Sequence, residues 1–121
     1  MSLDAAARRR YARQLLLGEI GEAGQERLFE AAFRPGAGGD AEASAAATEY
    51  LERAGCPVTE EGAELHVPDG AAVARFAGSP ALRTAAALVM GAFTATEHLK
   101  EVLGIADARE FPPGLRLSQE D

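Results

Sequence analysis

The chain is poor in the residue types from which many functional sites are built. Its 121 residues include one cysteine and one lysine, and neither tryptophan nor asparagine. A single cysteine excludes an intramolecular disulfide and a zinc site made of four thiolates. The longest stretch without a charged residue, 84–96, is far shorter than the roughly 20 apolar residues of a membrane-spanning helix. Because no secretory leader pattern precedes it, we expect a cytoplasmic protein without a membrane partner.

Basic side chains are also scarce relative to acidic ones. The chain has 12 lysines and arginines against 19 acidic residues, which gives a net charge of −7. Nucleic-acid binding depends on neutralising phosphates, so DNA and RNA are not expected partners. The composition is 47% hydrophobic, but 27 of these residues are alanine, which favours helices and buries little area. The composition therefore predicts a helix-rich fold with a thin core, and we expect a homodimer.

Several segments have apolar residues at helical spacing and are flanked by residues that begin and end helices. The last is the strongest, because Ser79-Pro80 is a typical helix start and Gly104 is a typical helix end. Since almost no charge falls within it, this helix is predicted to be the buried centre of the domain, with Leu88 and Leu99 nearly fully buried. The predicted helices are 4–17, 25–32, 40–54 and 80–103.

Small residues recur at every fourth position of the last predicted helix, at Ala87, Gly91 and Ala95. Such a row of small side chains lets another helix approach closely. We expect this ridge, or the arginine-rich helix at the N-terminus, to form the dimer surface.

Two short segments, 56–59 and 63–67, are predicted to be strands. Glu60-Glu61-Gly62 between them suits a hairpin turn, with the glycine at its positive-φ position. His66 alternates with two apolar residues and is expected to be exposed. Segment 71–76 fits either a strand or a helical turn, and 115–117 could add an edge strand.

Residues 10–28 read RYARQLLLGEIGEAGQERL. This segment resembles the opening of the ThiF/MoeB/HesA family of ubiquitin-activating-enzyme-like proteins, which begin R-Y-x-R-Q and continue with I-G-x-x-G-Q-x-x-L. Residues 95–104, ATEHLKEVLG, are similar to the A-x-E-A-L-K-x-L-x-G helix near the end of that family's nucleotide-binding domain. Residues 50–55, YLERAG, look like the end of its first crossover helix. The chain has only about half the length of a complete family domain, so an internal block is missing relative to the family.

The resemblance implies an α/β fold, here a truncated, helix-rich Rossmann-like domain with a small sheet of about three short strands. It implies a single domain over residues 1–121, with N-terminal helices at 4–32, a core at 40–105 and a tail at 106–121. Family members bind ATP and adenylate the C-terminal glycine of a ubiquitin-like sulfur carrier or modifier, usually as dimers.

The residues that match the family's nucleotide site are Gly36, Gly38, Gly39 and Arg13. The three glycines lie in a G-x-G-G turn like the one that holds phosphates at a helix N-terminus in the family. Arg13 matches a family arginine that reaches across the dimer to a partner's nucleotide. Asp40 follows the turn where the family has a hydrophobic residue, so a carboxylate would face the phosphates. These residues therefore predict a vestigial site.

The rest of the family's machinery has no counterpart in this sequence. The acidic D-x-D turn and the S-N-L-x-R-Q motif are absent, and the only lysine, Lys100, falls in the C-terminal motif. We assign no catalytic residue and no metal ligand, and expect no cofactor unless the vestigial site still binds ATP and magnesium. Cys56 is expected to be a small buried side chain.

Two functions are consistent with this pattern. The first is a degenerate family member without a complete adenylation site, acting as a non-catalytic, dimeric interaction or assembly protein. The second is the non-catalytic half of a heteromeric adenylating enzyme that acts on a ubiquitin-like sulfur carrier. In that case the chain would pair with a full-length ThiF-like paralogue and supply Arg13 to the partner's ATP. Independent adenylyltransferase activity would need a phosphate site that the sequence does not provide.

Overall fold

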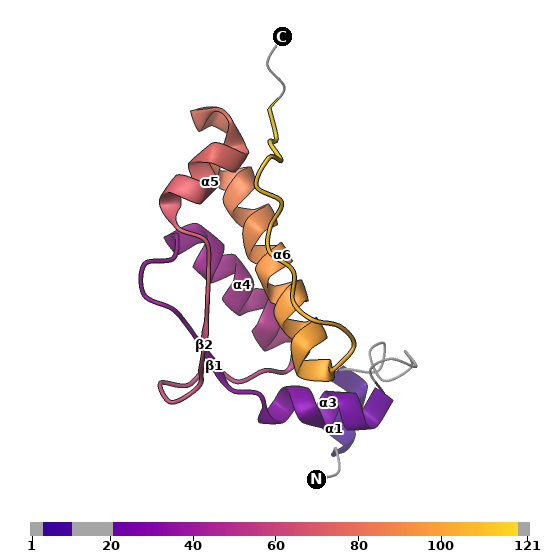
Figure 1. Ribbon diagram of the computed structural model, residues 1–121. Helices are drawn as coiled ribbons and strands as arrows, with labels where there is room; N and C mark the ends of the chain where they lie inside the picture. The colour runs from indigo at the N-terminus through magenta and orange to yellow at the C-terminus, as the bar shows by residue number, and fades with distance from the viewer. Residues whose placement is uncertain (1–3, 11–20, 119–121) are drawn as a thin grey trace.

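A parallel β–α–β unit lies at the centre of the fold. Strand β1 (Phe33–Pro35) leads through a glycine-rich loop into helix α4 (Ala41–Ala54), and strand β2 (Ala63–Leu65) returns to pair with β1 in parallel. The structure, a computed structural model, describes residues 4–10 and 21–118. Figure 1 shows the arrangement of its elements. The remaining elements are α1 (Ala5–Arg10), α3 (Gly21–Glu30), α5 (Gly70–Ala77), the short 3-10 turn η1 (Pro80–Leu82) and α6 (Arg83–Leu103).

Helix α4 begins and ends where the sequence predicts. The Ala43 N–H donates to the Asp40 carboxylate at 3.0 Å, and Gly55 ends the helix with a φ of 114°. The fully buried side chain of Gln25 in α3 donates to the Ala54 carbonyl at 2.7 Å. This bond satisfies one of the last carbonyls of α4, which have no partner within the helix.

Helix α6 packs along α4 through small residues on both helices (Figure 1). Ala87, Gly91 and Ala95 are all buried. A Cβ atom at position 91 would lie 2.5 Å from the Ala43 carbonyl oxygen and 2.7 Å from the Ala46 Cβ. The ridge is therefore used inside the chain, and the expectation that it forms a dimer surface is wrong. The helix that packs against this ridge is α4 of the same chain, through its alanine-rich face.

The prediction that Leu88 is buried is also wrong. Leu88 is 52% exposed, the neighbouring Val89 is 44% exposed, and Leu99 is only half-buried against the core. The run of uncharged residues that suggested a central helix includes the side of α6 that faces away from α4. A helix without charged residues is therefore not necessarily packed against other elements on every side.

The predicted hairpin is wrong, because the two strand-like segments lie on opposite sides of β1. Phe33 donates its N–H to the Pro57 carbonyl at 2.9 Å and accepts from the Thr59 N–H at 3.0 Å, whereas β2 pairs with the other edge of β1. Gly62 is needed for close packing and has no positive φ, since a Cβ there would lie 2.6 Å from the main chain of Phe33.

Strand β1 was not expected, because Phe33-Arg34-Pro35 is not a continuous apolar run. Phe33 directs its main-chain groups away from β2, and Pro35, two residues on, directs its missing N–H to the same side. A proline is tolerated in a strand at a position where no ladder bond is lost. In the described residues the sheet therefore has two strands and a single bridge at Val58, where about three strands were expected.

Helices cover one face of the sheet. Phe33 and Leu65 are buried, while on the other face Arg34 pairs with Glu64 at 3.5 Å and His66 is exposed, as predicted. The described chain is thus α/β in the broad sense. Two strands with one covered face do not make the doubly wound sheet of a Rossmann fold, which has helices on both faces.

The remaining predictions of helices and strands have mixed outcomes. The segment 71–76 is helical within α5, and α3 begins at Gly21, four residues before the start of the predicted helix 25–32. Residues 115–117 form no strand, because the Leu117 N–H donates to the Phe76 carbonyl in α5. The first predicted helix is described only as α1, and its remainder lies outside the described residues. Within the described ranges, no single helix is long and apolar enough to cross a membrane.

The α4–α6 contact gives a direct test of the packing. Replacing Gly91 with alanine should lower the free energy of unfolding by about 1–3 kcal/mol, because the new methyl group meets main chain that cannot yield. Gly114→Ala is the matched control, since a Cβ there meets nothing within 4 Å. Urea denaturation measures both variants. Equal stabilities would show that the two helices are not this close.

Candidate functional site

The glycine loop lies between β1 and the N-terminus of α4, in the strand–turn–helix order that a phosphate-binding loop requires. The structure brings Gly36, Gly38 and Gly39 together there, as predicted. Arg13, the fourth predicted site residue, lies outside the described residues.

Two of these glycines lie close against β2 and the residues that follow it. A Cβ at Gly36 would lie 2.9 Å from the Glu64 Oε1, and a Cβ at Gly39 would lie 2.8 Å from the Val67 Cβ. Gly38 has a φ of 90° and open space around its Cα, which is the requirement of a turn. The glycine pattern therefore has a structural cause that involves no ligand.

The anion position at the start of α4 is occupied by a side chain of the protein itself. The Asp40 carboxylate accepts from the Ala43 N–H and binds the Arg83 guanidinium, and its side chain is only 5% exposed. The main chain is also engaged, because the N–H of Gly36 donates to the Leu65 carbonyl and that of Asp40 to the Pro68 carbonyl, both at 2.8 Å. A phosphate at a helix N-terminus needs unbonded N–H groups and no competing anion. The Gly36 and Asp40 N–H groups and the Asp40 carboxylate do not meet these requirements.

Electrostatics hold this arrangement in its charged form. Burial opposes ionisation of Asp40, but the Ala43 N–H and the Arg83 guanidinium together lower its pKa below the usual value. Asp40 in turn raises the pKa of Arg83, which also bonds the Glu42 carboxylate at 3.0 Å. Two carboxylates thus bind the Arg83 guanidinium, which is not left to bind phosphate.

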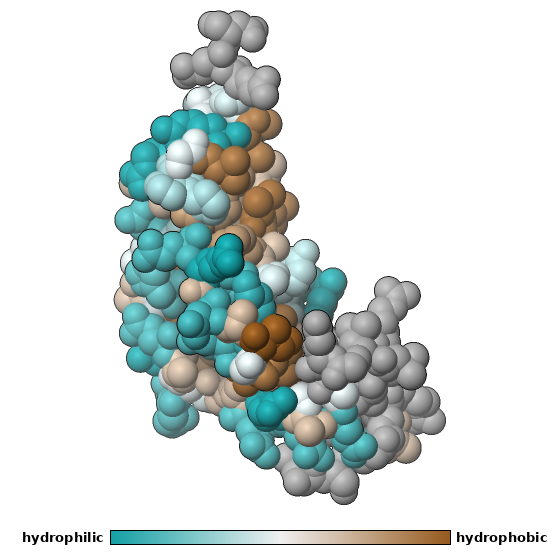
Figure 2. Space-filling model, turned by 45° about the vertical axis from the view of Figure 1, so that its right-hand side comes forward, coloured by the Kyte–Doolittle hydropathy of each residue, from teal (hydrophilic) through white to brown (hydrophobic). Residues whose placement is uncertain are grey.

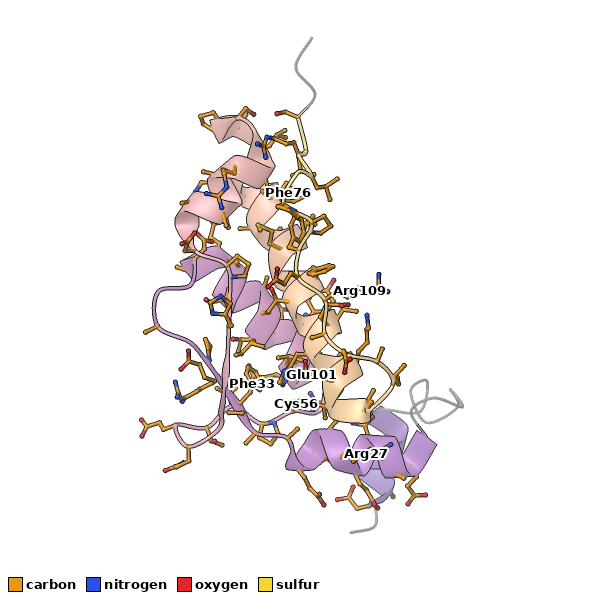
Figure 3. The ribbon with its side chains drawn as sticks, viewed as in Figure 1. Arg27, Phe33, Cys56, Phe76, Glu101 and Arg109 are labelled. Carbon is orange, nitrogen blue, oxygen red and sulfur yellow. The ribbon has the colours of Figure 1, made fainter. Side chains whose placement is uncertain are left out.

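A shallow groove of about 630 Å³ lies on the other side of β2, between α5, α6 and the tail segment 106–118. Its apolar wall is an aromatic cluster, in which the Phe111 ring packs edge-on against Phe76 at 4.6 Å and Phe93 at 5.2 Å. Figure 3 shows Phe76 and Arg109 along the path of the tail beside α6. Charged residues of both signs line the groove, so it favours neither an anionic nor a cationic ligand.

Glu97 fixes the tail to α6. Its carboxylate accepts from the Arg109 main-chain N–H at 2.8 Å and from Lys100 at 2.9 Å. These two hydrogen bonds lower the pKa of Glu97 below its usual value, and the bond from Lys100 has the larger effect. This role of Glu97 was not predicted, although the spacing of three between Glu97 and Lys100 indicates an ion pair on one helix face.

The other titratable side chains show no catalytic arrangement. Burial raises the pKa of the Cys56 thiol to about 11, which agrees with the prediction of an inert buried cysteine. Burial lowers the pKa of His98, whose ring lies 6.4 Å from that of Phe33. The groove contains His66 and His98 but no serine or cysteine with which either could form a nucleophile–base pair. In the described part of the chain, no cluster of histidine, cysteine and acidic residues could hold a metal.

No family model matches the chain, and no curated protein or solved structure matches it either.

Asp40 can be tested by separating its capping role from its ion pair. Asp40→Asn keeps a capping oxygen and loses the charge, and should lower the free energy of unfolding by about 1 kcal/mol at pH 7. Asp69→Asn is the matched control, because Asp69 caps α5 through the Ala72 N–H at 2.9 Å but has no arginine bound to it in the described structure.

The same pair of variants predicts a pH dependence. Because the folded state lowers the pKa of Asp40, its charge stabilises the protein above the ordinary aspartate pKa near 4 and loses this effect as the pH falls further. The gap between wild type and Asp40→Asn should therefore shrink in acid denaturation series below about pH 4. A gap that stays constant would contradict the ion pair.

The attachment of the tail gives a second prediction. Glu97→Ala should make trypsin cleave after Arg109 several-fold faster, because the carboxylate that holds the Arg109 N–H is lost. Glu101→Ala, an exposed position one turn further along α6, is the control. Mass spectrometry of the fragments, under conditions where circular dichroism shows both variants folded, measures the rates. Equal rates would show that Glu97 does not hold the tail.

Proposed function

We propose that this chain is a degenerate relative of the ThiF/MoeB/HesA proteins that has no working nucleotide site and acts as a non-catalytic, dimeric interaction or assembly protein. The observation that carries the proposal is the state of the glycine loop. The Asp40 carboxylate, bound to Arg83, lies where a phosphate would lie. Transfer of an adenylyl group depends on groups that stabilise charge on phosphoryl oxygens, and a fixed anion at that position has the opposite effect.

The order of elements supports the relationship to a nucleotide-binding ancestor. A strand, a glycine loop, a helix and a second parallel strand follow one another from Phe33 to Leu65. A Rossmann-like domain begins with a unit of the same order. The domain proposed here would be a truncated one, with the rest of the sheet missing and α6 packed directly on α4.

The described residues of the two longer segments that carry the resemblance have packing roles, which supports the idea that chemistry was lost and assembly kept. Gln25, in the N-terminal motif, bonds the end of α4, and Leu28 is buried in the core. Ala95 and Leu103, in the C-terminal motif, are also buried. The two motifs meet where α3 packs on α6 (Figure 1).

The test is a titration of the full chain with ATP and magnesium, followed by pyrophosphate exchange. We expect no saturable heat at micromolar protein and no exchange above background, because the N–H groups of Gly36 and Asp40 and the Arg83 guanidinium are already bonded. Exchange that Gly38→Ala abolishes and Gly114→Ala does not would contradict the proposal. Gly38 suits this test because a Cβ there meets no neighbouring atom, so the change strains the loop backbone at its φ of 90° without a clash with a neighbouring side chain.

A further inference from the structure

The free edge of strand β2 forms one wall of the groove between α5, α6 and the tail. Its pairing with β1 uses the main-chain groups of Ala63 and Leu65, and the Ala63 N–H donates to the Ala32 carbonyl at 3.1 Å. Because successive main-chain groups of a strand point in opposite directions, those of Glu64 point away from β1. Glu64 lines the groove, and in the described residues its N–H and C=O take part in no main-chain hydrogen bond. The same holds for His66.

The tail lies on the opposite side of this groove and leaves the edge of β2 open. It is fixed to α6 where Glu97 accepts from the Arg109 N–H, and to α5 where the Leu117 N–H donates to the Phe76 carbonyl. No main-chain hydrogen bond joins the described part of the tail to β2. Figure 1 shows the tail following α6, while the chain after β2 leads to α5. The groove of about 630 Å³ is therefore bounded on one side by an unpaired strand edge.

Uncharged side chains of α6 line the groove at a spacing that suits an extended segment. Met90, Thr94 and His98 are four residues apart on α6 and all line the groove. Four residues of a helix rise about 6 Å, and alternate residues of a strand are about 6.6 Å apart. Burial lowers the pKa of His98, so its ring is neutral at pH 7, and methionine adapts to many apolar shapes. Alternate side chains of a strand laid along α6 would meet these three residues in turn.

An unpaired strand edge specifies its partner more closely than an apolar surface does. Figure 2 shows hydrophobic side chains gathered along the upper right-hand side of the molecule, and such a patch does not fix the form of a partner. N–H and C=O groups along a strand edge bind the main chain of another extended segment, while the pockets beside them select its alternate side chains. Charged residues of both signs line the groove, which favours a segment without strong net charge.

We propose that this groove is a strand-addition site, in which an extended peptide segment of another protein pairs with the free edge of β2. The main chain of the segment bonds Glu64 and His66, and its apolar side chains, at alternate positions, lie over Met90 and Thr94. The segment adds a third strand to a sheet that has two in the described residues. The site rests on the proposed function, because it names the kind of partner that a non-catalytic interaction protein would bind.

Peptide selection on the full chain tests the site. Peptides selected from a random displayed library should have apolar residues at alternate positions, and the most enriched one, carrying a fluorescent label, is the probe for anisotropy titrations. Glu64→Pro should weaken its binding about 10-fold, because it removes an N–H that the peptide uses and β1 does not. Glu64→Ala is the matched control, since it loses the same side chain and keeps the N–H. Circular dichroism should show both variants folded.

Two threonines of α6 test the wall that the helix contributes. Each hydroxyl donates to the carbonyl four residues before it at 2.8 Å, but Thr94 lines the groove whereas Thr96 is exposed outside it. Thr94→Arg should weaken peptide binding about 10-fold or more, because the long side chain takes the space of the segment. Thr96→Arg should leave the affinity unchanged.

Amide hydrogen exchange gives the signature of strand pairing. The selected peptide should slow exchange of the Glu64 N–H about 10-fold or more and leave that of Ala63 unchanged, because the Ala63 N–H is already bonded to Ala32. A library that yields no alternating peptide, or binding that Glu64→Pro leaves intact, would overturn this site and leave the proposed function standing. A dimer that Glu64→Pro dissociates would show that a second copy fills the edge, and would overturn a partner protein. Pyrophosphate exchange by the same preparation would overturn the proposed function and not this site.

Discussion

The close contact between α4 and α6 is the constraint on which the rest of the structure depends. A chain so rich in alanine cannot fill a wide gap between helices, so it brings the helices together until the methyl groups of α4 touch the main chain at Gly91. Both helices run in the same direction, because Gly91 lies beside Ala43 and Ala46 while Arg83 lies beside Asp40. The close approach therefore also sets what lies at the shared N-terminal end.

At the N-terminal end of α4 and α6, the glycine loop, which has the form of a nucleotide-binding loop, has a structural role. Arg83 begins α6 and meets Asp40 at the start of α4, while the glycines let the loop lie against Val67 and its neighbours. The anion that stabilises the helix N-terminus is thus part of the chain.

The features that the sequence predicts correctly are those that local chemistry decides. Asp40 and Gly55 bound α4, and Gly104 ends α6, because caps and left-handed glycines act on their own neighbours. The strand pairing could not be read in this way, since β1 is three residues long and its partners come from two separate segments. The glycines of the site were found from their pattern, but their packing depends on residues 64–67, and the anion beside them depends on Arg83, 43 residues away from Asp40. Leu88 was misplaced because an apolar helix does not reveal which of its sides has a neighbour.

Amide hydrogen exchange of the glycine loop tests the central claim, that this loop is packed and bonded within the chain and does not wait for a phosphate. The N–H groups of Gly36 and Asp40 donate to the Leu65 and Pro68 carbonyls. They should therefore exchange as slowly as the N–H of Ser44 inside α4, and addition of ATP and magnesium should not change their rates. Exchange at the rate of an unstructured peptide, slowed by the nucleotide, would contradict the account.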